Sequence, residues 1–382
     1  MTTERPFVYD ADQHITFSLE HTADLAPEFH SRRPRIVHVE DGEGLGRHDS
    51  SYLFEGRLLP STYGPGTNPG NFPKQKDLVE SGLYTDTPFL SWSWGAQTLT
   101  DPGERIVLQE KHGVDVSVLY PSTIYAQVAD DPALEASLYR AYNSFLARQT
   151  GYDRSKLRYA GLLPLRDRDQ AFAAIEEMLE GGASAALVYG TAGAQFLHDP
   201  TFTPIFNELE RVGLPVAIHA GQSYRPLNAF GDTLYRAISV GFTVPAILAF
   251  SSLTAGGLLD RHPGIKWGFL EFGSEWLLYL VTRGDKYREL SQAGVYHTDL
   301  PEQAIVDYTR SDRFFISGEA DSPYLPLELE LVGDGGWLFA SDLPHDEGRE
   351  FAADAVLTRD DLTDEQKRLI IGANAAQFYR EP

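Results

Sequence analysis

Short apolar runs alternate with amphipathic segments along most of the chain, and this alternation is the main structural signal in the sequence. Near-continuous apolar runs such as PVAIH and WGFLEF are typical of strands that are buried on both faces. Eight runs of this kind predict strands at Phe7–His14, Val114–Tyr120, Leu157–Leu163, Ala185–Tyr189, Pro215–His219, Trp267–Phe272, Phe314–Ser317 and Trp337–Ser341.

The segments between these runs have helical spacing and recognisable ends. In Thr203–Val212, we expect Thr203 to be the N-cap and Gly213 to end the helix. Asp169–Leu179 repeats the pattern and is followed by Gly181. Because a strand follows each helix at once, the strands are predicted to be parallel, as in a barrel or a doubly wound sheet. Eight strands favour the (β/α)8 TIM barrel.

Residues 15–112 interrupt the alternation after the first strand and are rich in Gly, Pro, Ser, Tyr and charge. We expect one barrel domain over residues 1–382 with this segment inserted, although the length alone would also suit two ordinary domains. Within the insertion, Tyr63–Gly95 is predicted to be an irregular lid and Asp101–His112 a helix. Insertions after barrel strands lie on the catalytic face, which favours a lid over a decorative subdomain.

Composition narrows the class of partner. The chain of 382 residues carries a net charge of -23, which repels nucleic acid and anionic membranes, so a small-molecule substrate is the expected partner. The absence of cysteine leaves histidine and carboxylate side chains to hold any metal. The sequence shows neither a secretory signal nor a stretch long enough to span a membrane, which predicts a soluble cytoplasmic protein. The sequence leaves open whether the protein forms a homo-oligomer.

Ionisable side chains stand at the carboxyl ends of predicted strands, where barrel enzymes carry their catalytic residues. Asp12 and His14 end the first strand on one face, His219 ends the fifth, Glu271 lies near the end of the sixth and Asp342 follows the eighth. Each alone is more often a hydrogen-bonded structural group. Burying them together without a cation would cost desolvation and repulsion, so the joint pattern predicts one bound divalent metal ion.

Eight motifs follow one another in the order DADQH, GVDVSVLYPS, YNSFLARQ, LRYAGLLPL, LPVAIHAG, LEFGSEW, ASDLPH and IIGANAAQFY. This ordered set resembles the amidohydrolase-related family, which also contains the aminocarboxymuconate-semialdehyde decarboxylases. The resemblance covers most of the chain and is weakest in residues 15–105. It implies a mononuclear metal site formed by Asp12, His14, His219 and Asp342.

Two positions depart from the family's pattern. Asp12 stands where the first histidine of a His-x-His pair is more common, and the additional carboxylate lets Mn2+ or Mg2+ compete with Zn2+, which we expect first. Glu271 stands where decarboxylase members generally have a catalytic histidine. We expect Glu271 or Asp342 to move the proton in catalysis. His345 would orient Asp342 or a water, or else pack within its loop.

Three further residues are candidates for substrate binding. Arg225, just after the fifth strand, is either a clamp for a substrate carboxylate or a surface arginine. Trp92 and Trp94 would wall the substrate cavity or fill core.

The function favoured by these residues is metal-dependent hydrolysis of a small organic acid, amide, lactone or activated C-C bond by an activated water. The first alternative is metal-dependent non-oxidative decarboxylation, and a dehydratase or cyclase on the same site is another. A barrel that only binds a ligand is a less favoured alternative.

Overall fold

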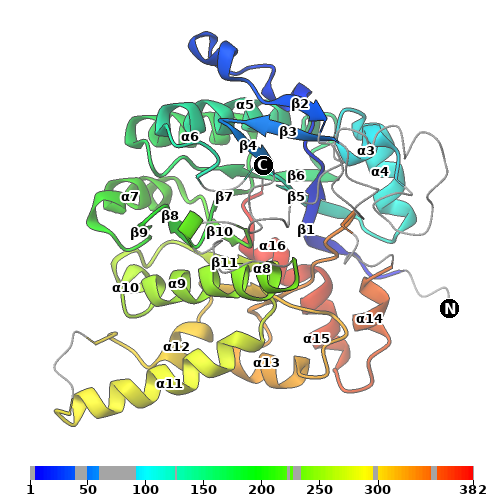
Figure 1. The fold of residues 1–382 in the computed structure, drawn as a ribbon. Helices are drawn as coiled ribbons and strands as arrows, with labels where there is room; N and C mark the ends of the chain where they lie inside the picture. The colour runs from blue at the N-terminus through cyan, green and yellow to red at the C-terminus, as the bar shows by residue number, and fades with distance from the viewer. Residues whose placement is uncertain are drawn as a thin grey trace.

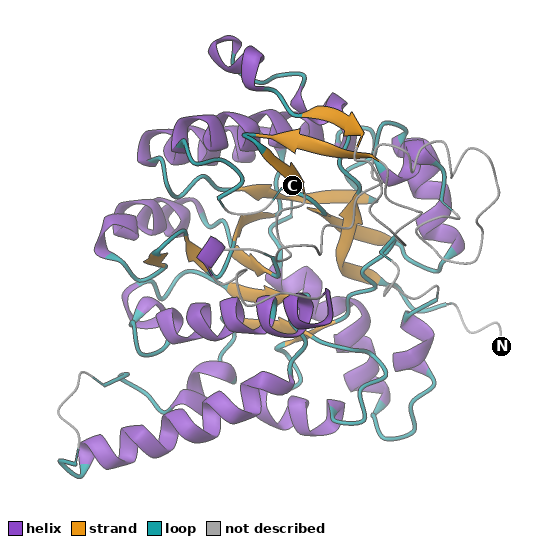
Figure 2. Cartoon of the chain, in the orientation of Figure 1, coloured by secondary structure: helices purple, strands orange, loops and turns teal. Residues whose placement is uncertain are grey.

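The fold was analysed in a computed structural model of the 382-residue chain. Figure 1 shows strands at the centre with helices around them, and Figure 2 separates the two by colour. The structure describes residues 5–38, 50–59, 92–124, 127–221, 224–226, 234–295, 300–345 and 351–381.

Eight parallel strands form the central sheet and confirm the predicted (β/α)8 barrel. Their order in the sheet is their order along the chain, as expected when each crossover helix leads to the neighbouring strand. All eight predicted strands are present, with ends that differ by a few residues. The strands are β1 (Tyr9–Ile15), β5 (Val116–Pro121), β6 (Leu157–Leu162), β7 (Ala185–Val188), β10 (Val216–His219), β11 (Trp267–Leu270), β12 (Phe314–Ser317) and β13 (Trp337–Leu338).

The barrel closes at an irregular seam where the chain that follows β13 meets β1. Ala11 N donates to Phe339 O at 2.9 Å, and Asp342 N donates to Asp12 O at 3.0 Å. The register between β1 and β5 shifts within the stretch from Asp10 to Gln13, which marks a β-bulge. The strand predicted at Trp337–Ser341 therefore ends early, because its later residues bond to the bulged edge of β1 outside a regular ladder.

Helices fill the connections between the strands and cover the outside of the barrel (Figure 2). The α-helices are α3 (Trp94–Gln97), α4 (Pro102–Lys111), α5 (Pro132–Thr150), α6 (Arg168–Gly181), α7 (Thr203–Val212), α8 (Leu234–Gly241), α9 (Thr243–Leu253), α10 (Leu258–Arg261), α11 (Glu275–Gln292), α12 (Ile305–Thr309), α13 (Leu325–Val332), α14 (Ala353–Leu357), α15 (Asp364–Arg368) and α16 (Asn374–Phe378). Shorter elements are the 3-10 helices η1 (Leu19–Thr22), η2 (Pro27–Arg32) and η3 (Pro200–Phe202), the π-helix η5 (Leu369–Ala373), and the strands β2 (Arg35–His38), β3 (Ser50–Phe54), β4 (Arg57–Leu59), β8 (Thr191–Ala192) and β9 (Gln195–Phe196). Among the described residues, the helices lack one long and apolar enough to cross a membrane.

The helix ends correct two details of the prediction. Thr203 is the first residue of α7 and not its N-cap, because η3 precedes it and takes its own cap from Asp199. Gly213 ends α7 in the left-handed region with φ 66°, as predicted. In α6 the left-handed residue is Gly182 with φ 78°, one position after the predicted Gly181, which still belongs to the helix.

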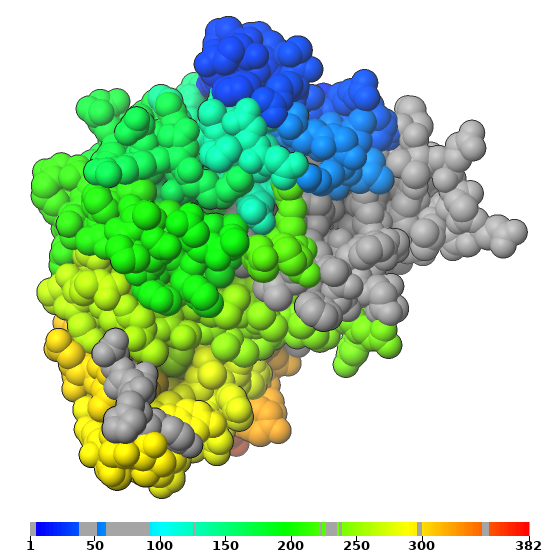
Figure 3. Space-filling model, turned by 60° about the vertical axis from the view of Figure 1, so that its left-hand side comes forward, coloured from blue at the N-terminus to red at the C-terminus, as the bar shows by residue number. Residues whose placement is uncertain are grey.

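The described part of the insertion packs beside the loop that follows β5. Its strands β2, β3 and β4 form an antiparallel sheet, and Arg57 pairs with Asp130 at 2.6 Å while Arg32 pairs with Asp131 at 2.7 Å. In Figure 3 this blue surface lies beside the teal surface at the start of α5. The helix predicted at Asp101–His112 is present as α4. Most of the predicted lid lies outside the described residues.

His21 is buried inside the insertion as a neutral imidazole. Nε2 lies 2.9 Å from the Thr98 carbonyl and Nδ1 accepts from Ser18 N, so only the tautomer with the proton on Nε2 satisfies both contacts. Burial lowers the pKa of His21 from 6.5 to about 4. Protonation is therefore much easier in the unfolded chain than in the folded one.

We expect His21 to make the protein less stable in acid. Its contribution is complete above the unfolded pKa and is lost as the pH falls toward the folded pKa, by about 3 kcal/mol at 1.36 kcal/mol per pKa unit. Denaturant unfolding of the wild type and of His21→Gln at several pH values measures this loss of stability. The difference in unfolding free energy between the two proteins should shrink between about pH 6.5 and pH 4; a difference independent of pH contradicts the prediction.

Candidate metal centre

Asp12 and His14 are the first two members of a buried cluster at the carboxyl ends of the strands. Both side chains are 1% exposed and lie in the last part of β1. His219 is the final residue of β10, Glu271 directly follows β11, and Asp342 lies beyond β13. The structure thus brings together the five groups that the strand ends predicted.

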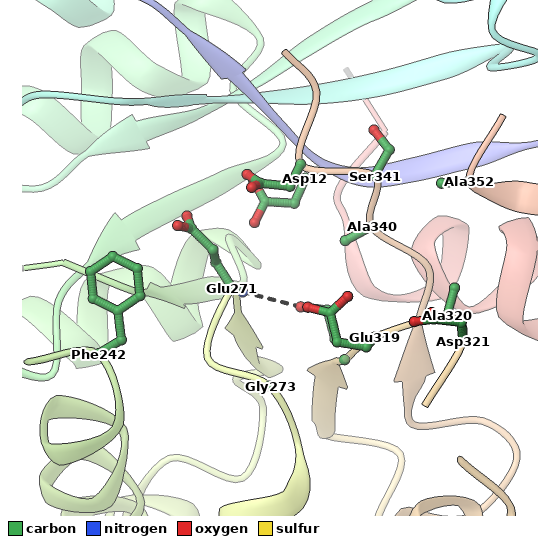
Figure 4. Close-up of a pocket in the computed structure, with 13 residues that line it drawn as sticks. Asp12, Phe242, Glu271, Gly273, Glu319, Ala320, Asp321, Ala340, Ser341 and Ala352 are labelled. Atoms are coloured by element: carbon green, nitrogen blue, oxygen red, sulfur yellow. Dashed lines mark hydrogen bonds between the residues drawn. The ribbon is translucent and has the colours of Figure 1, made fainter. Parts of the chain in front are cut away.

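Short distances link the five side chains, although Asp342 groups with His14, Glu271 and His345 and not with Asp12 and His219. His14 Nε2 lies 3.0 Å from Glu271 Oε2 and 3.1 Å from Asp342 Oδ1. His219 Nε2 lies 3.2 Å from Asp12 Oδ2 and 3.1 Å from the same Glu271 oxygen. Figure 4 shows the carboxylates of Asp12 and Glu271 directed toward each other.

A divalent cation fits the chemistry of this cluster. Ligand atoms of Asp12, His14, His219 and Glu271 all lie within 4.8 Å of one another. Both carboxylate oxygens of Asp12 are buried, and within the described residues they make no hydrogen bond. Three carboxylates held this close repel one another and lose hydration, and a cation removes both costs.

Two members of the cluster have unusual backbone conformations. Glu271 has φ 64° and Asp342 has φ 58°, in the left-handed region that disfavours residues with a Cβ atom. Such strain costs of order 1–3 kcal/mol per residue and persists where the surroundings impose it. The carboxylate of Glu271 lies against both His14 and His219, and that of Asp342 lies against His14.

Hydrogen bonds orient the ring of His219 and the carboxylate of Asp342. His219 Nδ1 lies 2.8 Å from the carbonyl of Ala220, which fixes the proton on Nδ1 and directs the Nε2 lone pair to the cluster. His345 Nδ1 lies 3.0 Å from Asp342 Oδ1, and its Nε2 lies 2.9 Å from Ser122 Oγ. The sequence did not indicate Ser122, although it follows β5 directly at the predicted catalytic face.

A cavity of about 260 Å³ opens beside the cluster. Five acidic residues line it, namely Asp12, Glu271, Glu319, Asp321 and Asp342. No lysine or arginine is among its described lining residues. The other described lining residues are Phe242, Gly273, Ser317, Gly318, Ala320, Ala340, Ser341 and Ala352.

The sequence profile of amidohydrolases matches residues 80–380, which is most of the chain. The chain belongs to the amidohydrolase family. A 2-amino-3-carboxymuconate-6-semialdehyde decarboxylase of Dictyostelium discoideum is 22% identical to this amidohydrolase over 313 residues, covering 80% of the chain and 81% of the relative.

Solved structures share the fold of this chain. An amidohydrolase from Mycobacterium avium subsp. paratuberculosis superposes with a TM-score of 0.76 at 19% identity, covering 98% of this chain and 97% of that one. A 5-carboxyvanillate decarboxylase from Novosphingobium aromaticivorans, in complex with manganese and 4-hydroxy-3-methoxy-5-nitrobenzoic acid, superposes with a TM-score of 0.69 at 16% identity, covering 98% and 96%.

The pKa values of the two strained carboxyls, Glu271 and Asp342, are shifted in opposite directions. Burial raises the pKa of Glu271 well above its usual range, and the negative charge of Asp342 adds to the effect. Burial acts on Asp342 in the same direction, but His345 and His14 outweigh it and hold the pKa of Asp342 below its usual range. Neighbouring carboxyls with opposite proton affinities are a common arrangement for acid-base chemistry.

The three predicted substrate-binding residues of the amidohydrolase lie elsewhere. Arg225 pairs with Asp130 and donates to the Gln127 carbonyl on the rim of the barrel. Trp92 is fully buried, and Trp94 is the first residue of the short helix α3. None of the three is among the described residues lining the cavity, so their contact with substrate stays a prediction.

Proposed function

We propose that this protein is a metal-dependent non-oxidative decarboxylase of a small, conjugated carboxylic acid. The carboxylate-rich cluster beside a cavity of about 260 Å³ carries the proposal. The cavity offers a substrate carboxylate no arginine or lysine among its described lining residues, so recognition of the acid depends on the ion. The two decarboxylases described above support this reaction over the hydrolysis that the sequence favoured.

We further propose Mn2+ as the ion. Asp12 and Asp342 add hard oxygen donors to His14 and His219, and such mixed sites suit Mn2+ better than sulfur-containing ones do. The manganese bound by the Novosphingobium decarboxylase supports the same choice. Zn2+, which the sequence led us to expect first, has no comparable support.

In this proposal the ion supplies charge neutralisation and orientation of the substrate carboxylate. Loss of carbon dioxide breaks the C-C bond and leaves an electron pair on the substrate carbon, which takes up one proton. Glu271 borders the cavity beside the cluster, so its carboxyl is placed to hold that proton. His345, bonded to Asp342 and Ser122, keeps the Asp342 carboxylate in place.

Product analysis in deuterated water tests the function. Mn2+-loaded protein incubated with 5-carboxyvanillate and related aromatic acids should release one carbon dioxide for each molecule consumed. The vacated carbon should carry one solvent deuteron, because the proton comes from the site and not from the substrate. Esters, lactones and amides of similar size serve as a parallel panel, and turnover of these without carbon dioxide release contradicts the proposal in favour of hydrolysis.

A further inference from the structure

A buried chain of three polar residues lies directly behind the metal centre. Asp10, Gln13 and Arg105 are each 0% exposed, and none of them was among the site residues predicted from the sequence. Arg105 belongs to α4 in the insertion, whereas the other two belong to β1. We call these three residues the relay.

The side-chain amide of Gln13 connects the guanidinium of Arg105 to the carboxylate of Asp10. Arg105 Nη2 donates to Gln13 Oε1 at 2.8 Å, and Gln13 Nε2 donates to Asp10 Oδ2 at 2.8 Å. The oxygen end of the amide dipole therefore faces the positive charge and the nitrogen end faces the negative charge. This arrangement stabilises two buried charges that do not touch.

Both ends of the relay bond to the backbone beside the candidate metal ligands. Asp10 Oδ1 accepts from the backbone N of Asp12 at 3.2 Å and of Ser341 at 2.9 Å. Arg105 Nη1 donates to the carbonyl of His14 at 3.0 Å. The carbonyl of Leu343 lies 3.5 Å from Arg105 Nη2. The relay thus contacts the chain on both sides of the barrel seam.

Regular strand ladders join the neighbouring strands from β1 to β13, but the seam between β1 and the chain after β13 has no such ladder among the described residues. β1 carries its bulge between Asp10 and Gln13, and Asp342 adopts a positive φ. A ligand on an irregular backbone needs other contacts to stay within the small tolerance that metal coordination allows.

We propose that Asp10, Gln13 and Arg105 are positioning residues that set the relative placement of Asp12, His14 and Asp342 for the metal ion. The inference rests on the proposed metal-dependent function. The inference also gives the insertion a role in the site, because the Arg105 guanidinium of α4 joins the two sides of the seam.

Arg158 offers a matched control for Arg105. Both arginines are buried, and each guanidinium lies over an aromatic ring, at 4.7 Å from Trp92 for Arg105 and at 5.0 Å from Tyr9 for Arg158. Arg158 is near the start of β6 and bonds to the Tyr9 hydroxyl, at the end of the barrel away from the ligands. Loss of either arginine should cost stability, but only Arg105 should affect the ion.

The experiment measures Mn2+ affinity and the electron paramagnetic resonance spectrum of bound Mn2+. We expect Arg105→Met to weaken Mn2+ binding by about 10- to 100-fold, the usual cost of losing a group that orients metal ligands, and to change the spectrum at saturating Mn2+. Arg105→Lys keeps the charge and should lose less affinity. Arg158→Met should keep the wild-type affinity and spectrum. Gln13→Met serves as a second test of the relay if Arg105→Met does not fold.

The outcomes separate this inference from the proposed function. Wild-type protein that binds Mn2+ and releases carbon dioxide, together with folded relay variants of unchanged affinity and spectrum, overturns the inference alone. Equal losses in Arg105→Met and Arg158→Met also overturn it, because the effect is then one of general stability. Wild-type protein that binds no divalent ion overturns the proposed function and the inference with it.

Discussion

Removal of the metal ion is expected to lower the turnover of the purified enzyme by about three orders of magnitude or more, since an ion that neutralises a substrate carboxylate is worth several kcal/mol. Under the proposed function we expect a large loss, because the described cavity lining has five carboxyl groups and no cationic side chain. Exhaustive chelation followed by an assay of carbon dioxide release measures the effect, and elemental analysis should find about one divalent ion per active chain.

Reconstitution is the control for chelation. Added Mn2+ should restore the activity, and circular dichroism should show that the metal-free protein is still folded. Zn2+ and Mg2+, tested in the same way, establish whether the ion preference follows the oxygen-rich ligand set. Full activity in metal-free protein contradicts the prediction.

Replacing Glu271 by glutamine should lower turnover by about two to four orders of magnitude, the usual span for loss of general acid-base assistance. The amide keeps the size of the side chain but cannot deliver a proton. If proton transfer is its only role, the Mn2+ content stays at the wild-type level. Steady-state kinetics and elemental analysis of the same Glu271→Gln preparation measure both quantities.

Glu319→Gln is the matched control, because Glu319 also lines the cavity but is not among the clustered ligand groups of the described residues. Its effect on turnover should be much smaller. Loss of Mn2+ from Glu271→Gln would assign Glu271 to the ligand set, which its 3.0 Å and 3.1 Å approaches to the two histidines permit. Unchanged turnover would move the proton-transfer role to Asp342 or His345.

The fold and the cluster could be predicted because both follow from local sequence features. Buried parallel strands leave continuous apolar runs, and barrel topology gathers their carboxyl ends at one mouth. Asp12, His14 and His219 needed only their places at strand ends to be brought together. The strain at Glu271 and Asp342 could not be anticipated, because a positive φ outside glycine leaves no signal in the sequence.

The remaining parts of the site depend on long-range packing. Arg105 meets Gln13 only after the insertion has folded against β1, and nothing in the sequence of α4 distinguishes a buried arginine from a surface one. Ser122 enters the site through its contact with His345, which lies far away in the sequence. Arg225 and Trp92 have protein partners that the sequence did not indicate, because Arg225 pairs with Asp130 and the ring of Trp92 stacks on His112.

The seam between β1 and the chain after β13 also has a consequence for how the protein is made. Asp12 and Asp342 stand far apart in the sequence, so a ribosome must make the chain as far as Asp342 before the two can meet at the seam. Contacts of such long sequence separation form late, after their loop-closure entropy has been met by the rest of the barrel. If the proposed metal site is correct, ion binding reports that the barrel has folded completely. Truncated or partly folded chains would lack the seam that brings Asp12 and Asp342 together.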